Sequence, residues 1–148
     1  MKAIHTILLA VFAATLGAQA GGEGWGTDLD AAFETAKKEK KPVLVEFTGS
    51  DWCPPCKMMR EKVFTKKSFI EKASKDFILV ELDFPRGDKE LAEKNQPHAK
   101  KYNIEGFPTV ILFDENGKEF DRFYASQYPS IEQFLGHLKD ALGKKGLE

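Results

Sequence analysis

The chain has 148 residues, of which 42% are apolar and 30% charged, an ordinary balance for one soluble globular domain with its own core. The 22 basic and 23 acidic side chains leave a formal net charge of −1, so there is no electrostatic case for binding nucleic acid or an anionic membrane surface. The lysine pairs at 37–38 and 40–41 are balanced by acidic residues and indicate a solvated helix face.

Residues 1–20 differ in composition from the rest of the chain. Lys2 is their only charged residue, the stretch 4–16 is mostly apolar, and Ala18-Gln19-Ala20 has the small-x-small pattern of a cleavage site. The apolar run is too short for a comfortable membrane span. This pattern predicts a signal peptide cut after Ala20, with an uncleaved anchor or a buried first helix as the alternatives. Cleavage leaves residues 21–148 as one periplasmic or secreted domain, not inserted in a membrane, with its core at about 27–143.

Hydrophobic spacing and turn residues divide the rest of the chain into alternating helices and strands. Thr27 with Asp30 resembles a capping box at the start of a first helix. Apolar residues then recur at helical spacing to about Glu39. Pro42 stops this helix and opens a strand at 43–47.

The middle of the chain predicts further helices around a second strand. A helix is expected over about 53–63, and Thr65 can cap the short helix after it. Residues 77–83 are strongly apolar, which suits a strand covered on both faces. Residues 88–102 have a helical pattern interrupted at Pro97, so two pieces or a kink are expected there.

The last third of the chain predicts a hairpin and a closing helix. Strands are expected at 108–114 and 118–124, because the Asn116-Gly117 pair between them favours a tight turn. Ser130 with Gln133 forms the capping box of a final amphipathic helix. A βαβ unit with a parallel strand pair, followed by an antiparallel hairpin, predicts a single α/β domain with a mixed sheet.

The only two cysteines of the chain lie two residues apart in the stretch Asp-Trp-Cys-Pro-Pro-Cys-Lys, where the intervening prolines suit the first turn of a helix. Backbone N–H groups and the positive dipole end at a helix start stabilise a thiolate on Cys53. Cys53 follows Trp52 in a loop, so its sulfur is expected to be accessible. The stabilised thiolate is expected to attack a target disulfide. Cys56, one turn further on, is expected to be more buried and to resolve the mixed disulfide.

Other uses of the two cysteines fit less well. A purely structural disulfide that closes so short a loop contributes little stability. A closed zinc site usually needs more Cys or His ligands than the chain offers with His5, His98 and His137, so no metal site is expected. A c-type haem site would need His where Lys57 stands. Reduced thiolates remain compatible with Cu(I), so a copper-handling protein stays an alternative.

The stretch Val-Glu-Phe-Thr-Gly-Ser-Asp-Trp-Cys-Pro-Pro-Cys-Lys at 45–57, followed by Gly-Phe-Pro-Thr at 106–109, resembles the thioredoxin superfamily. The resemblance covers about 29–142 in motif order and element order. It implies a thioredoxin fold, an α/β structure with a mixed four- to five-stranded sheet flanked by helices. It also implies that Pro108 is cis and lies beside the Cys53–Cys56 disulfide, where the backbone of Phe107 can pair with a substrate segment.

The same resemblance implies a substrate-binding surface around the cysteines, formed by Trp52, Pro54, Pro55, Phe107 and Thr109. An ordinary proline at the start of a strand is the alternative reading of Pro108. The pairing of the two motifs favours the first interpretation.

Three features depart from the family pattern. Glu46 stands where an aspartate is usual, and one extra residue follows its strand. Glu46 could be a buried carboxyl with a raised pKa that exchanges the Cys56 proton, or a glutamate at the strand end that reaches water; both stay open. Asp51 is nearer to the cysteines in sequence and is expected to be exposed. The segment 85–103 is also longer than in small thioredoxins, and a larger covering helix is expected there.

These features predict an exported thiol–disulfide oxidoreductase that acts on protein disulfides in the bacterial periplasm. Reduction of substrate disulfides is the favoured direction. No cofactor is needed, because the dithiol itself carries two electrons. The expected partners are substrate protein thiols or disulfides and an electron-relay protein that recharges the site, and the protein is expected to be a monomer. The alternatives are a thioredoxin-like binding module without turnover and the copper-handling protein.

Overall fold

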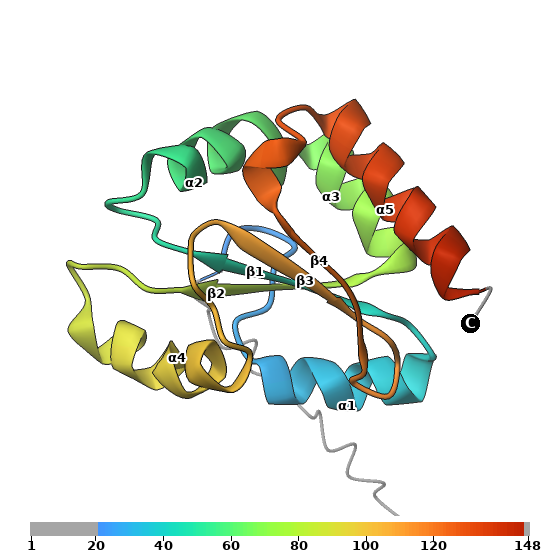
Figure 1. Ribbon diagram of the computed structural model, residues 1–148, viewed down its shortest axis with the longest axis horizontal. Coiled ribbons are helices and arrows are strands. Elements are labelled where there is room, and N and C mark those ends of the chain that lie inside the picture. Colours follow the sequence, from blue (N-terminus) through green and yellow to red (C-terminus); the bar gives the residue numbers. More distant parts are fainter. Residues whose placement is uncertain (1–20, 147–148) are drawn as a thin grey trace, which may run out of the picture.

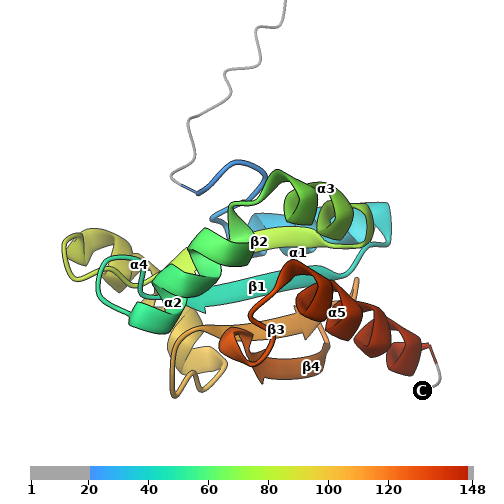
Figure 2. The same cartoon turned by 90° about the horizontal axis from the view of Figure 1, so that it is seen from above.

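A computed structural model of the chain describes residues 21–146. Its centre is a four-stranded mixed sheet in the order β2-β1-β3-β4 (Figure 2). β1 and β2 pair in parallel, whereas β1–β3 and β3–β4 pair antiparallel, as the sequence predicts for a mixed sheet. The strands are β1 (Val43–Thr48), β2 (Ile78–Asp83), β3 (Thr109–Phe113) and β4 (Glu119–Tyr124).

Helices cover both faces of this sheet (Figure 1). One face carries α1 (Leu29–Glu39) and α4 (Lys89–Lys101). The other carries α2 (Pro54–Met59), α3 (Lys67–Asp76) and α5 (Ile131–Lys145). Two short turns complete the order, the π-helical η1 (Arg60–Phe64) and the 3-10 helix η2 (Ala125–Gln127). The expected thioredoxin fold is confirmed, with four strands in the described part of the chain.

The central strand β1 is buried along its whole length, because helices lie over both of its faces. Its odd-numbered residues, such as Val45, pack with α1 and α4, while Leu44 packs with the cluster of α3 and α5. Glu46 shares the Leu44 face, since residues two apart in a strand point to the same side. The alternation therefore places one carboxyl group of the central strand among the apolar side chains under α2, α3 and α5.

Three details of the helices differ from the sequence predictions. α1 is capped by Asp28, whose carboxylate accepts from the Ala31 N–H, and not by Thr27. Thr65 ends η1 instead of capping the next helix: its hydroxyl donates to the Arg60 carbonyl. A short polar side chain can cap either end of a turn, and only the path of the chain decides which backbone group it meets.

α4 is one continuous helix with Pro97 inside it, so of the two expected outcomes, two pieces or a kink, the first is wrong. Proline removes one backbone N–H, and its intrahelical acceptor would have been the carbonyl of Glu93, an exposed residue that water can satisfy. Ala99 of the same helix packs on the sheet, which keeps the helix in place. The long segment 85–103 thus supplies a covering helix, as expected.

Candidate active site

The two cysteines form a disulfide at the start of α2, with their Cα atoms 5.2 Å apart. Cys53 is the N-cap residue in an extended conformation, and Pro54 and Pro55 occupy the first turn, as the sequence predicts. Both prolines lie at or near the surface. The helix start is built by a loop that folds back, because the Cys53 N–H donates to the carbonyl of Gly49 at 2.9 Å.

Both sulfurs are enclosed in this oxidised state. Cys53 is only 3% exposed and Cys56 is 0% exposed, so the expectation of a reachable Cys53 is wrong for the disulfide form. The tight loop before the helix is the physical reason, since it holds both cysteines against the end of β1. There the Gly49 N–H approaches the Cys56 sulfur to 3.5 Å and can donate to it.

The loop 106–109 reaches the cysteine loop through aromatic contact. The Phe107–Pro108 peptide bond is cis, as the resemblance implies. The rings of Trp52 and Phe107 meet edge to face with their centroids 5.7 Å apart. Thr109 is buried and its hydroxyl donates to the Gly106 carbonyl, which fixes the turn. The structure thus brings together two stretches separated by about fifty residues.

The loop that follows β2 also contacts Trp52. Its indole N–H donates to the Phe84 carbonyl at 2.8 Å, and the Arg86 guanidinium stacks 4.7 Å from the centre of its ring. Asp51, exposed as expected, accepts from the Arg86 and Gly87 N–H groups at 2.9 and 2.7 Å. Sequence reasoning missed this loop because its residues lie more than thirty positions from the Asp51 and Trp52 side chains that they hold, and they carry no motif.

These two backbone hydrogen bonds hold the pKa of Asp51 below its usual range. An acid with a depressed folded-state pKa keeps its bonds above that pKa and loses them as the pH falls through it. The amide proton shifts of Arg86 and Gly87 should therefore change together during acid titration, with a midpoint below about 3.9, the ordinary value for aspartate. NMR titration measures this midpoint, and Asp51→Asn should abolish the transition. A midpoint at the ordinary value would show that the bonds do not favour the charged form.

Glu46 lies in the middle of the sheet and is 2% exposed, so it is buried and does not reach water at a strand end. Its partners in register are Glu81 on β2 and Val110 on β3. Burial raises the pKa of Glu46 well above its usual range, and the nearby charge of Glu81 raises it further. Arg60 and a hydrogen bond from the Thr48 side chain offset part of this rise.

Glu81 is a second buried carboxyl group, 7% exposed, and the sequence analysis did not single it out. In-register residues of adjacent strands point to the same face, so Glu81 and Glu46 are neighbours on the α2 side of the sheet. The Arg60 Nη1 atom lies 3.1 Å from the Glu81 carboxylate. Burial raises the pKa of Glu81 and the Arg60 charge opposes this rise. A charged residue inside an apolar strand was the signal that could have identified it.

Arg60 connects this acidic pair to the cysteine helix. Its backbone N–H donates to the Cys56 carbonyl, so the two residues lie one turn apart on the same side of the helix. α2 therefore carries the resolving candidate Cys56, and its C-cap Arg60 is the only residue in the described part of the chain that forms an ion pair with Glu81. The acidic pair can hold a proton on the α2 side of the sheet, because the low-dielectric site favours one neutral carboxyl group.

Comparison with known proteins agrees with this architecture. The family model described as a thioredoxin-like domain matches residues 29–142. The solved structure of a DsbH oxidoreductase has a TM-score of 0.72 and 30% identity, over 85% of this chain and 88% of that one. A thioredoxin from Thermus thermophilus, 21% identical with a TM-score of 0.64, covers 81% of this chain and 88% of that one and shares the fold.

Two curated proteins are also similar. The disulfide bond reductase DsbH of Chlamydia pneumoniae is 35% identical over 94 residues, which are 62% of this chain and 57% of that protein. The thioredoxin-related protein DsbJ of the same organism is 28% identical over 82% of this chain and 37% of its own length. The chain thus covers less than two thirds of these relatives. The match to the family model nevertheless spans most of the sequence, and the chain belongs to the thioredoxin-like domain family.

Proposed function

We propose that this protein is an exported thiol–disulfide oxidoreductase that reduces protein disulfides in the bacterial periplasm. The observation that carries the proposal is the Cys53–Cys56 disulfide at the start of α2, joined to the cis-Pro108 loop by the Trp52–Phe107 contact. The likeness to a protein named as a disulfide bond reductase supports the reducing direction. A pure binding module would need neither a paired dithiol nor a buried acidic pair linked to the cysteine helix through Arg60.

The reaction begins from the reduced dithiol. The Cys53 thiolate attacks one sulfur of the substrate disulfide, forms a mixed disulfide with it, and releases the other substrate sulfur as a thiolate that takes up a proton. The α2 N-terminus stabilises the attacking thiolate through its backbone dipoles. Cys53 serves as the nucleophile in this proposal because it stands at the N-cap, where this field is strongest.

The second step closes the protein's own disulfide. Glu46, ionised at the start of this step, takes the proton of Cys56 and ends the step protonated. The Cys56 thiolate attacks the Cys53 sulfur and releases the second substrate thiolate, which takes up a proton from solvent. Two electrons pass from the dithiol to the substrate, and no cofactor takes part in this scheme. A dithiol of a relay protein then returns two electrons and two protons to the Cys53–Cys56 disulfide.

The proposed substrate surface surrounds the two sulfurs. Trp52 and Phe107 form its aromatic part, and Pro54 and Pro55 its rim on α2. A substrate segment pairs in a strand-like way with the backbone at Phe107, beside cis-Pro108. Thr109 shapes this surface through its bond to the Gly106 carbonyl, so its hydroxyl serves the turn and not the substrate.

Export rests on the N-terminal sequence. Residues 1–20, proposed as a signal peptide, lie outside the described residues, and the proposed mature domain is 21–148. Within the described helices, none is both long and apolar enough to cross a membrane. We propose that the mature protein acts in the periplasm as a monomer, with substrate proteins and an electron-relay protein as its partners.

An insulin-disulfide reduction assay with dithiothreitol as the electron source tests the proposed activity. The protein should accelerate reduction well above the dithiothreitol background, whereas Cys53→Ser should give the background rate because no thiolate remains at the helix start. The serine variant is a matched control, since it differs by one atom. A wild-type rate equal to that of the variant would overturn the proposed reductase activity and favour a binding module.

A further inference from the structure

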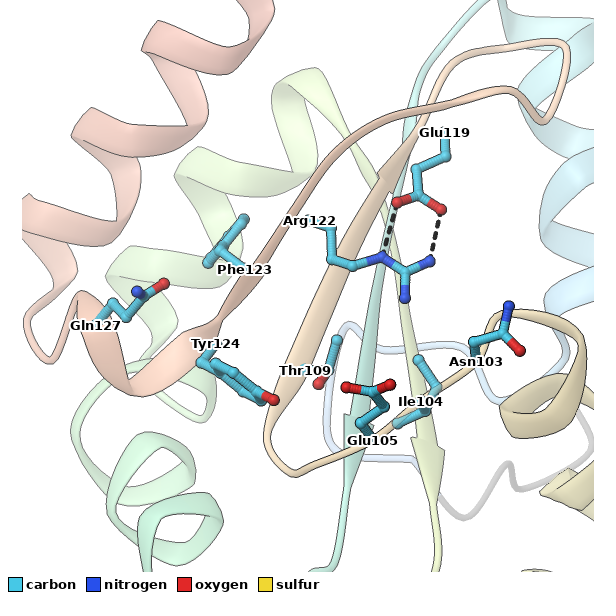
Figure 3. A pocket seen from close by; sticks show the side chains of 9 residues that line it. All are labelled: Asn103, Ile104, Glu105, Thr109, Glu119, Arg122, Phe123, Tyr124 and Gln127. Atoms are coloured by element: carbon cyan, nitrogen blue, oxygen red, sulfur yellow. Dashed lines mark hydrogen bonds and ion pairs between the residues drawn. The ribbon is translucent and has the colours of Figure 1, made fainter.

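A cavity of about 580 Å³ opens beside the proposed substrate surface (Figure 3). It lies between β4, the end of η2 and the loop that follows α4, and Thr109 lines it. Its volume is within the range of pockets that hold small ligands or side chains. None of the catalytic steps proposed above uses this cavity.

The cavity is continuous with the loop that carries cis-Pro108. Thr109 directly follows that proline and pairs in register with Tyr124 on β4. The Tyr124 ring lies against Gly106: a Cβ atom added there would come within 3.1 Å of a ring carbon. Gly106 thus lets the ring lie close to the loop, so that Tyr124 stands between the cis-proline loop and the cavity.

Tyr124 is 46% exposed, the highest value among large apolar side chains in residues 21–146. An exposed aromatic ring at the edge of a binding surface can contact the aliphatic part of a long side chain or lie under a cation. Ile104 adds an apolar wall to the same cavity. The cavity therefore suits an extended side chain with an apolar stem.

The charge of the cavity comes from Glu105. Arg122 also lines the cavity, but its Nε and Nη2 atoms donate to the Glu119 carboxylate and its Nη1 atom donates to the Tyr102 carbonyl, each at 2.7 Å. The Arg122–Glu119 pair is thus internally neutral. Glu105 is exposed and forms no ion pair within the described part of the chain. Figure 3 shows its carboxylate and the Tyr124 hydroxyl turned toward one another across the cavity.

We propose that this cavity is a subsite that binds a lysine or arginine side chain of the substrate polypeptide, next to the cysteine under attack. The aliphatic stem lies along Tyr124 and Ile104, and the cationic group meets the Glu105 carboxylate. A strand residue spans about 3.3 Å, so a segment paired beside Phe107 carries a side chain to the cavity within about three residues of its cysteine. The inference deepens the proposed function, on which it rests, by naming a preferred substrate class.

The test uses synthetic peptides that each carry one disulfide-linked cysteine. Lys, Ala or Glu is placed in turn at each position from three before to three after that cysteine, and kcat/KM for reduction is measured. At the position that reaches the cavity, the Lys peptide should be reduced about fivefold faster than the Glu peptide, as expected for an exposed ion pair. This preference should shrink at 0.5 M salt.

Two variants assign the preference to the cavity. Glu105→Gln should bring the Lys-to-Glu ratio close to one, and Glu105→Lys should invert it. Glu34→Gln is the matched control: Glu34 is exposed on α1, away from the cavity, and the variant makes the same change in net charge, so the ratio should stay as in the wild type.

The outcomes separate this subsite from the proposed function. Reduction of all peptides at equal rates, or a preference that survives Glu105→Gln, would overturn the subsite while leaving the reductase proposal intact. A preference that Glu34→Gln abolishes equally would assign it to net charge and also overturn the subsite. No reduction of any peptide would overturn both proposals.

Discussion

Cys56→Ser should hold a substrate protein on Cys53 as a stable mixed disulfide, and catalytic turnover should fall to the uncatalysed exchange rate. The reason is that the first attack still occurs, but no second thiol is present to displace the substrate. Incubation of the reduced variant with a disulfide-containing protein, followed by non-reducing gel electrophoresis, measures the trapped complex. A reducing agent should release it.

Cys53→Ser is the matched control, and it should trap at least about tenfold less substrate, because the remaining thiol is the inner one. Exposure alone does not decide this order, since Cys53 is 3% and Cys56 0% exposed in the disulfide form. The N-cap position of Cys53 is the stronger argument. Greater trapping by Cys53→Ser would reverse the two proposed roles, and equal trapping would show that neither cysteine has a fixed role.

Glu46→Gln should stabilise the folded protein at pH 8 by on the order of 2 kcal/mol relative to its effect at pH 4, because a neutral amide avoids the cost of burying a carboxylate. The raised pKa of Glu46 fixes the sign. At pH 4 and below, the carboxyl group is mostly protonated in both the folded and the unfolded state. As the pH rises, the unfolded state ionises first, so the wild type loses stability up to the folded-state pKa. Urea unfolding of the oxidised protein at both pH values measures the difference.

The same substitution should slow disulfide reduction roughly a hundredfold, a typical contribution of general acid–base catalysis, since the proposed proton acceptor for Cys56 is removed. Glu34→Gln, on the surface of α1, should change neither stability nor rate. If Glu46→Gln had the same effect on the free energy of unfolding at pH 4 and pH 8, folding would not raise the pKa of the carboxyl group. An unchanged rate across neutral pH would remove Glu46 from the mechanism.

The titration of Glu46 is coupled to that of Glu81. The two carboxyl groups are neighbours in register, and Arg60 pairs with Glu81 at 3.1 Å, so protonation of one depends on the charge of the other. The titration that unfolding or kinetics detects therefore belongs to the pair. Repeating the pH series in Glu81→Gln separates the contributions, because burial still raises the pKa of Glu46 but the additional repulsion from Glu81 is absent.

The sequence by itself determined the order of the elements, the mixed sheet and the place of the cysteines at a helix start. These features depend on local signals: hydrophobic period, turn residues and prolines that fit the first turn. The hairpin at Gly117 is an example, since its φ of 80° is accessible to glycine at little cost. Local ambiguity produced the errors at Thr27 and Thr65, where several backbone arrangements satisfy the same side chain. At Pro97 the missing N–H did not divide the helix.

Only the tertiary structure decided which distant residues meet. The sequence left Glu46 undecided between burial and solvent, and packing under α2, α3 and α5 settled it as buried. Glu81 and Arg60 became its neighbours through strand register and the path of the helix after Cys56, neither of which has a local signature. The cavity at Glu105 and Tyr124 likewise joins the loop after α4 to the edge strand β4. Contacts of this kind depend on where whole elements dock, and side-chain spacing along one element carries no information about that.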